Sequence, residues 1–407
     1  MDVLTLIIDS RGAVYPYTLI SKRLNDYGVN AKMYITADIE LPADFVGAIH
    51  DTFNTDEASR DYPVHSAENN TLKLLRDSQR FIKEWVPGII RTILDAIEEG
   101  TLVPENTIVI GNSPTLVNLG HFLLELGFKG FIVLEPYRMI DWTDSWRSDK
   151  SQMLPSGVPF ISNLLTRQGK QLTKKIYGHT KYGFKDIKRA VIAQGHMYSP
   201  LLCGDRELAL GYPYEDINQS LADSVLEFID RQRKSGKKLI VLTLGSMQMS
   251  EAKQKSMANE LKEATLRLPD FATIVLGKIS KYIDGDDSIL PLDQFVPFSL
   301  LFQKVDLVIH HHGAGTMHTV LRAGKPSFAV TFVPDQNDWA TRLSLLGIST
   351  GSILARNFHA DYLVEHIERN LTPELIEKAS EVGIVERGQY SDGLERCVRF
   401  VMSNIEK

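Results

Sequence analysis

The chain has 407 residues, 43% of them hydrophobic, which is enough for two ordinary domains with separate cores. Its formal net charge of −6 argues against duplex nucleic acid as a bulk electrostatic partner. Two distant cysteines, Cys203 and Cys397, argue against a disulfide framework and favour a cytoplasmic location. No run of about 18 apolar residues occurs, so we expect no membrane-spanning segment, and only peripheral membrane contact stays open.

In the first part of the chain, short apolar runs alternate with amphipathic segments. The runs predict strands, and the segments between them predict helices. The strands are Val3–Ile8, Lys32–Thr36, Thr107–Gly111 and Gly130–Leu134, and the helices are Pro16–Tyr27, Gln79–Glu99 and Pro114–Leu126. Strands that are apolar throughout are typical of parallel sheets covered on both faces. The first part of the chain therefore predicts an α/β lobe.

A second part with the same alternation follows a polar stretch around Ala209–Gly236, which we interpret as a connector. Its predicted strands are Lys238–Leu244, Ala272–Gly277, Asp306–His310 and Ser327–Phe332, with helices at Glu251–Leu268, Gly315–Ala323 and Asn337–Leu346. The expected fold class is α/β, with two Rossmann-like lobes at residues 1–215 and 216–385. We expect their parallel sheets to face a central cleft, with ligands at the carboxyl ends of the strands.

The stretch Val308–His318 connects a strand to a helix through a turn that contains glycine. Free backbone N–H groups and the positive end of the helix dipole converge at Gly315 and Thr316, so the turn suits a phosphate. A histidine at the end of the strand could hydrogen-bond the same phosphate. The alternative is a plain strand–turn–helix junction in which Thr316 serves only as a cap.

Two other ligands fit parts of this stretch. Gly313-Ala-Gly315 resembles the opening of a dinucleotide fingerprint, and Asp335 lies at a suitable distance, but His318 stands where a third glycine would be needed. Three adjacent histidines could indicate a metal, but successive strand residues point to opposite faces and no acidic or cysteine partner has a helical ligand spacing. We therefore predict neither a metal nor a cofactor.

A carboxylate beside a carboxamide, Asp335-Gln336, comes one βα step after the phosphate turn. Such a pair offers acceptors and donors suited to vicinal sugar hydroxyls. Taken alone, Asp-Gln is merely a good helix start. At this position, the pair predicts the sugar end of a ligand whose phosphate lies at the preceding turn.

The segment from His311 to Arg342 resembles the donor-binding signature of nucleotide-sugar glycosyltransferases of the plant, sterol and antibiotic-tailoring family. It is most similar to the sterol glucosyltransferase branch, through a histidine with a Gly-Ala-Gly-Thr turn, Arg-Ala-Gly-x-Pro and Asp-Gln-x-x-Trp-Ala-x-Arg. The same resemblance includes Gly245-Ser246 and Phe295–Pro297, and weaker similarity covers Ser10–Pro16 in the first lobe. The resemblance implies the two-lobed GT-B fold, with a C-terminal helix in residues 386–407 that packs back on the first lobe.

The resemblance also implies an activity, the transfer of a hexose from a UDP- or dTDP-sugar to a hydroxyl of a lipophilic acceptor. The acceptor would be a sterol, a glycolipid or a natural-product aglycone, and the reaction would be inverting and metal-independent. The implied diphosphate ligands are Gly245, Ser246, His311, Gly313, Ala314, Gly315 and Thr316, with Phe295 and Val296 at the base and Asp335 and Gln336 at the sugar. Candidate acceptor residues are Ser10, Asn112 and Trp142.

No residue at the expected position of this chain can act as the general base of such a reaction. The family places a histidine or aspartate where this sequence has Ala13, and a methyl group cannot accept a proton. Asp9 at the end of the first strand is the nearest replacement, with a plain capping role as its alternative; His50, Asp51 and His65 are weaker candidates. Two other functions therefore stay open, a non-catalytic binder of nucleotide sugars and a sugar-nucleotide epimerase.

Overall fold

The computed structural model describes the chain at residues 1–7, 11–36, 51–53, 86–135, 171, 174–175, 188–192, 208–214, 220–245, 247, 249–294, 296–332 and 334–405. Two compact units divide the chain. Unit 1 consists of Met1–Val64, Asn70–Glu215 and Tyr390–Lys407, and unit 2 consists of His65–Asn69 and Asp216–Gln389. The chain enters the final part of unit 1 at Tyr390, whereas the sequence placed that boundary at residue 386.

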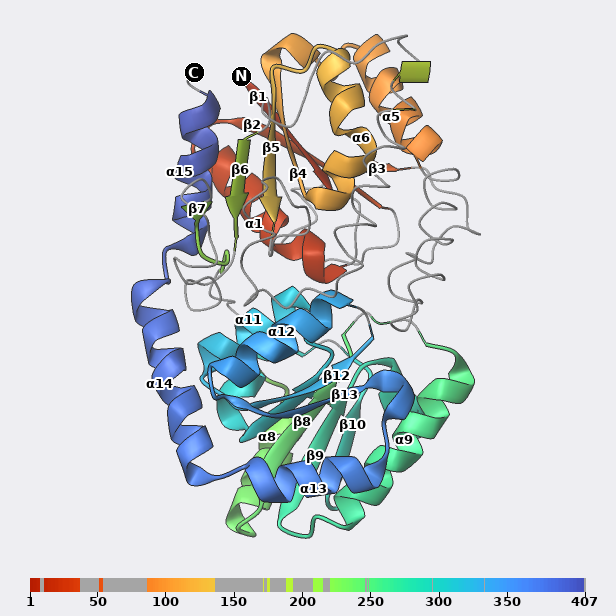
Figure 1. The fold of residues 1–407 in the computed structure, drawn as a ribbon, viewed down its shortest axis with the longest axis vertical. Coiled ribbons are helices and arrows are strands. Elements are labelled where there is room, and N and C mark those ends of the chain that lie inside the picture. The colour runs from red at the N-terminus through yellow and green to blue at the C-terminus, as the bar shows by residue number, and fades with distance from the viewer. Residues whose placement is uncertain are drawn as a thin grey trace, which may run out of the picture. The chain divides into compact units, whose positions relative to one another are not determined.

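Unit 1 is built on a parallel sheet of seven strands in the order β3-β2-β1-β4-β5-β6-β7 (Figure 1). The strands are β1 (Asp2–Ile7), β2 (Asn30–Thr36), β3 (Asp51–Phe53), β4 (Thr107–Gly111), β5 (Gly130–Glu135), β6 (Lys188–Val191) and β7 (Leu208–Ala209). The order reverses between β1 and β4, which places the carboxyl ends of these two strands at a topological switch point.

Helices cover both faces of this sheet because successive strand residues point to opposite sides. Val3 and Ile7 of β1 pack with α1 and α15, whereas Leu4 and Leu6 pack with α5 and α6. The helices are α1 (Arg11–Asp26), α5 (Val86–Glu98), α6 (Ser113–Glu125) and α15 (Gly393–Ile405). The last helix of the chain thus completes the core beside the first strand, as Figure 1 shows for α15 and α1.

The start of α15 packs closely against the segment that follows β7. A Cβ on Gly393 would lie 2.5 Å from the carbonyl oxygen of Tyr212, and one on Gly211 would lie 3.1 Å from the Cα of Gly393. Gly211 also has a φ of 90°, which favours glycine. The segments at which the chain leaves and re-enters unit 1 therefore lie side by side.

Helix α1 begins earlier than the sequence analysis predicted. The predicted helical pattern begins at Pro16. The helix instead begins at Arg11 and contains Pro16 in its interior, where proline removes one backbone donor. Buried Tyr17 donates a hydrogen bond to the carbonyl oxygen of Leu134 and ties the helix to the end of β5.

Unit 2 has a parallel sheet of six strands in the order β10-β9-β8-β11-β12-β13. The strands are β8 (Lys238–Thr243), β9 (Phe271–Leu276), β10 (Ile289–Leu292), β11 (Leu307–His310), β12 (Ser327–Thr331) and β13 (Ser349–Leu354). Numbered within the unit, this order is the 3-2-1-4-5-6 order of a Rossmann fold, so the switch point lies between β8 and β11.

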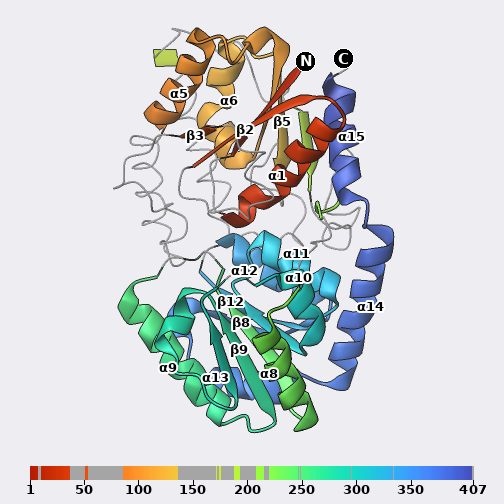
Figure 2. The same cartoon turned by 180° about the vertical axis from the view of Figure 1, so that it is seen from behind.

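The helices of unit 2 again cover both faces of the sheet, and Figure 2 looks onto the face that carries α8. They are α8 (Asp223–Lys234), α9 (Glu251–Leu266), α10 (Phe298–Leu301), α11 (Ala314–Ala323), α12 (Pro334–Leu345), α13 (Ala360–Asn370) and α14 (Pro373–Gln389). Helix α11 ends at Gly324, whose φ of 67° is left-handed, and a Cβ on Gly383 of α14 would overlap the Cα of Gly324. Backbone contact therefore fixes α14 against the end of α11.

Candidate functional site

The carboxyl ends of β8 and β11 form the site to which the sequence motifs point. The two strands pair directly, with His310 in register with Thr243. Gly245 follows β8, and His311, His312 and Gly313 follow β11, so residues far apart in sequence meet at the switch point of unit 2. In open α/β sheets this position is where ligands bind.

His311 lies between two glycines that come from different strands. A Cβ on Gly245 would overlap Cε1 of the His311 ring, and a Cβ on Gly313 would overlap its Nε2. Gly245 also has a φ of 57°, in the left-handed region. The structure thus brings together three of the predicted site residues, and any larger residue at either glycine would displace the imidazole.

Helix α11 begins directly after this histidine. Gly313 is its N-cap and supplies no side chain to cap the first turn, and the first helical bond runs from the N–H of Met317 to the carbonyl oxygen of Gly313 at 2.9 Å. Ala314, Gly315 and Thr316 precede that bond and are half-buried. Their N–H groups and the helix dipole make this end of the helix suited to an anion.

His310 and His312 form a stacked pair beneath the turn. Their ring centroids lie 4.1 Å apart, and the N–H of His312 donates to Nδ1 of His310 at 3.2 Å. His312 also shares a hydrogen bond of 2.9 Å with Oγ of Ser327, the first residue of β12. Burial lowers the pKa of His312 to about 3 and that of His310 well below its ordinary value, so both rings are neutral at physiological pH.

His318, where a dinucleotide fingerprint would need glycine, is part of the packing of unit 2. Its Nδ1 donates to the carbonyl oxygen of Ala314 at 2.7 Å, and its ring meets Trp339 edge to face at 5.6 Å. Burial lowers its pKa to about 3, against the opposite effect of the Ala314 hydrogen bond. The imidazole therefore joins the first turn of α11 to α12 as a neutral group.

The turn between β12 and α12 uses the carboxamide of Gln336. Its Oε1 accepts from the N–H of Phe332 at 2.7 Å, and its Nε2 lies 3.2 Å from Sδ of Met247. This arrangement resembles a capping box, in which a side chain of the first helical turn reaches back to the preceding backbone. Gln336 is buried, and through Met247 it links the turn after β12 to the turn after β8.

The structure describes some of the other predicted site residues and not the rest. Val296 is buried in the core of unit 2, and Asn112 is buried directly after β4 at the switch point of unit 1. Asp335 is the second residue of α12, and Ala13 lies in the first turn of α1, but no side-chain placement is described for either. Asp9, Ser10, Trp142, Ser246 and Phe295 lie outside the described residues, as do the weaker candidates His50 and His65.

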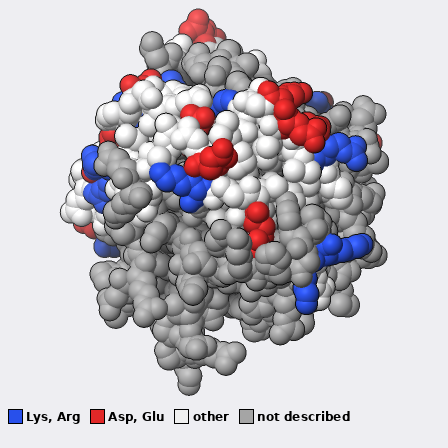
Figure 3. All heavy atoms as spheres, turned by 90° about the horizontal axis from the view of Figure 1, so that it is seen from above, with Lys and Arg blue, Asp and Glu red and all other residues white. Residues whose placement is uncertain are grey.

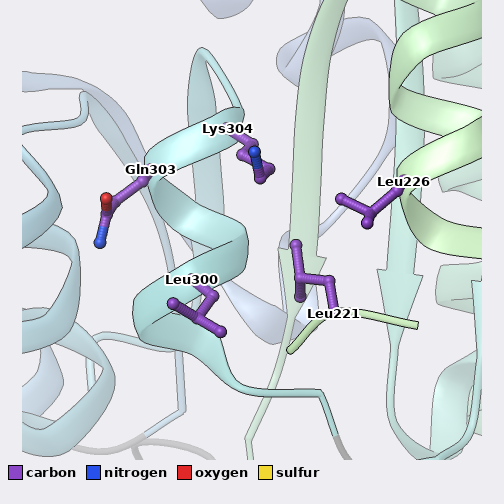
Figure 4. A pocket seen from close by; sticks show the side chains of 5 residues that line it. All are labelled: Leu221, Leu226, Leu300, Gln303 and Lys304. Atoms are coloured by element: carbon purple, nitrogen blue, oxygen red, sulfur yellow. The ribbon is translucent and has the colours of Figure 1, made fainter. Parts of the chain in front are cut away.

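Unit 2 also has a hollow that contains none of the predicted site residues. Figure 4 shows its lining of three leucines with one amide and one ammonium group. The residues are Leu221, Leu226, Leu300, Gln303 and Lys304. Because these described lining residues include no carboxylate, imidazole or hydroxyl group, they offer no chemistry comparable to that of the turns.

Charged side chains of both signs lie on the face of the molecule shown in Figure 3, interspersed among its described residues. Most of the basic stretch between residues 170 and 189 lies outside the described part of the chain, and Lys174 and Lys175 within it are exposed. Among the described helices, none is both long and apolar enough to cross a bilayer.

Comparison with known proteins identifies the fold. Over 99% of both chains, the structure superimposes on the glycotransferase of kitacinnamycin with a TM-score of 0.70 and 14% identity. A glycosyltransferase of Streptomyces sp. SF2575, crystallised with thymidine diphosphate, matches over 99% of both chains with a TM-score of 0.66 and 16% identity. No protein-family model matches the chain.

Curated sequences give a related result. A sterol 3-beta-glucosyltransferase of Komagataella phaffii is 30% identical over 45% of this chain and 15% of its own length. A sterol 3-beta-glucosyltransferase of Arabidopsis thaliana is 23% identical over all of this chain and 66% of its own length. The chain thus corresponds to only part of each of these curated relatives.

The two α/β units, each with a parallel sheet, define a GT-B fold together with the structural neighbours, which confirms the predicted fold class. Within that class, the chain is similar to the sterol 3-beta-glucosyltransferases, which confirms the resemblance predicted from the segment between His311 and Arg342.

Proposed function

We propose that this chain is a glycosyltransferase that moves a hexose from a UDP- or dTDP-sugar to a hydroxyl group of a lipophilic acceptor. The acceptor class is a sterol, a glycolipid or a natural-product aglycone, and the reaction is inverting and independent of metal. Similarity to sterol 3-beta-glucosyltransferases supports the acceptor class, and the thymidine diphosphate complex of a structural neighbour supports a nucleoside diphosphate donor.

One observation carries the proposal, the meeting of His311, Gly245 and Gly313 at the first turn of α11. The absence of side chains at both glycines lets the His311 ring lie against the backbone of the turn, beside the first amides of α11. The N–H groups of Ala314, Gly315 and Thr316 would donate to the diphosphate, and the imidazole of His311 would add one more donor. These groups would stabilise the negative charge that develops on the diphosphate as it leaves.

The sugar would lie toward the start of α12, where Asp335 occupies the second helical position. Its carboxylate would accept hydrogen bonds from vicinal hydroxyls of the hexose. Gln336 already uses Oε1 for the N–H of Phe332, so only its Nε2 would be available to a hydroxyl. We therefore assign the main contact with the sugar to Asp335 and a supporting contact to Gln336.

The proton of the acceptor hydroxyl needs a base in unit 1. Asp9 follows β1, and Asn112 follows the neighbouring strand β4, with Leu6 and Gly111 paired just before them. We propose that Asp9 accepts the proton while the acceptor oxygen attacks the anomeric carbon, and that Ser10, Asn112 and Trp142 orient the acceptor. The diphosphate leaves as the new glycosidic bond forms.

The test is to incubate the purified chain with UDP-glucose or dTDP-glucose and panels of sterols, glycolipids and aglycones, with a metal chelator present. We expect a hexosylated product by mass spectrometry, an inverted anomeric centre by NMR, and loss of turnover in Asp9→Ala. Turnover that needs a divalent metal would contradict the mechanism. Donor binding without transfer to any acceptor would indicate a non-catalytic binder, and an epimer formed from donor alone would indicate an epimerase.

A further inference from the structure

His312 has a backbone conformation that its residue type rarely adopts. Its φ is 56°, and it is the one residue other than glycine with a positive φ among those the structure describes. A non-glycine side chain in the left-handed region is strained, and such strain persists only where the surroundings hold it.

Three contacts hold the residue. Ser327 Oγ lies 2.9 Å from Nε2 of the ring, the His310 ring stacks on its face at 4.1 Å, and its N–H donates to Nδ1 of His310 at 3.2 Å. All three side chains are fully buried. Ser327 is itself fixed in the sheet, since Thr350 donates to its carbonyl oxygen at 3.3 Å.

The position of His312 in the chain makes its conformation relevant to the ligand. It lies between His311, whose ring fits against Gly245 and Gly313, and Gly313, which is the N-cap of α11. Its backbone torsions therefore set the direction in which the first amides of α11 leave the strand. Glycine would adopt the same φ without strain, so the shape of the turn does not by itself require a histidine at position 312. The buried imidazole adds contacts that hold this backbone conformation.

We infer that His312, held by Ser327 and His310, is a positioning residue that aims His311 and the first amides of α11 at the diphosphate of the donor. The inference rests on the proposed function and deepens it. Ser327 in the sheet and the stacked ring of His310 hold His312, and His312 holds the backbone of the turn. The phosphate groups therefore meet donors that are already oriented. Small displacements of such donors reduce binding and rate strongly.

The test compares the affinities of nucleosides with those of their diphosphates, because the donors that His312 is inferred to orient contact the diphosphate and not the nucleoside. Calorimetry would measure uridine, UDP, thymidine and dTDP with wild-type protein and with His312→Gly, His312→Ala and Ser327→Ala. We expect the preference for diphosphate over nucleoside to fall by about ten- to a hundredfold in each variant. Nucleoside affinity should stay within about twofold of wild type, because a nucleoside has no phosphate to contact these donors.

Thr265→Val is the matched control. Thr265 is buried in the same unit and shares a hydrogen bond of 3.1 Å with Thr273, so its substitution also removes a buried hydroxyl contact. It should leave the diphosphate preference unchanged. His312→Gly relieves the strained backbone and Ser327→Ala removes a single oxygen, so we expect both variants to fold. They can be measured even if His312→Ala does not fold.

The possible outcomes separate the two proposals. Equal losses of nucleoside and diphosphate affinity, or an unchanged preference in His312→Gly and Ser327→Ala, would overturn the positioning role and leave the proposed function standing. Wild-type protein that binds neither UDP nor dTDP more tightly than the nucleosides would overturn the proposed diphosphate site, and the positioning role with it.

Discussion

The Nε2 atom of His311 occupies the space that the Cβ of any larger residue at position 313 would need. The two residues are separated by one position in the sequence, yet they define opposite requirements. Position 311 carries the ring, and position 313 must carry no side chain. Position 245, which follows β8, must also carry none, because its Cβ would overlap the same ring.

Gly313→Ala should raise the dissociation constant for UDP or dTDP by about tenfold or more, because the added methyl group displaces the His311 ring. Calorimetry would measure the change. A double-mutant cycle supplies the control, since the same substitution in a His311→Ala background has no ring to displace and should cost little more. Equal penalties in both backgrounds would show that the clash is not the cause.

Gln336→Leu should lower the free energy of unfolding by about 1–3 kcal/mol, because the N–H of Phe332 loses its acceptor in a buried turn. Urea denaturation would measure this loss. Gln303→Leu is the control, since Gln303 is exposed and its Nε2 donates to the carbonyl of Ser299 at the surface. That change should stay within about 0.5 kcal/mol. If Gln336→Leu is as stable as wild type, its carboxamide has no structural role.

The buried histidines should make the protein less stable in acid. Burial lowers the pKa of His318 from its ordinary value of 6.5 to about 3, so between these values the unfolded chain binds a proton that the folded chain does not. The stability is then present above pH 6.5 and is lost as pH falls toward 3. His318→Gln should reduce this dependence by about 1.4 kcal/mol per pH unit, measured by urea denaturation from pH 6.5 to 4.5. An unchanged slope would contradict it.

Glu386 on α14 should act in the opposite direction. Burial raises its pKa from 4.5 to about 8, against the effect of Arg322 on α11. Between these values the folded chain keeps a proton that the unfolded chain has released, so stability falls as pH rises from 4.5 to 8. Glu386→Gln removes this dependence, and we expect its stability relative to wild type to increase with pH across that range. Thermal unfolding at pH 5 and pH 8 measures it, and a relative stability that falls with pH would refute the assignment.

Much of the fold could be predicted from the sequence because its central strands are apolar throughout. The predicted strand at Lys238–Leu244 corresponds to β8, and that at Asp306–His310 to β11. The edge strands had no such signal. β13 is polar at several positions, and β10 contains Pro291, which an edge strand tolerates because one side of its backbone needs no partner. Their identity depends on pairing, which periodicity alone does not reveal.

The glycines of the site could be predicted, but several of the contacts could not. The glycines at 245 and 313 indicate close backbone approach in any context. The pairing of His312 with Ser327 depends on β11 lying beside β12, whereas in the sequence alone three adjacent histidines are equally typical of a metal site. The contact between Gln336 and Met247 likewise joins turns 89 positions apart in the chain. Such contacts require the tertiary structure.

The closeness of Gly211 and Gly393 has a consequence for synthesis on the ribosome. All described strands of unit 2 lie between these two residues, so they emerge as one uninterrupted stretch, whereas the core around Val3 and Ile7 needs Val398 and Val401 from the last helix. The unit that is synthesised first is therefore completed last. In released chains truncated just before Gly393, we expect protease to digest the first unit while the second resists.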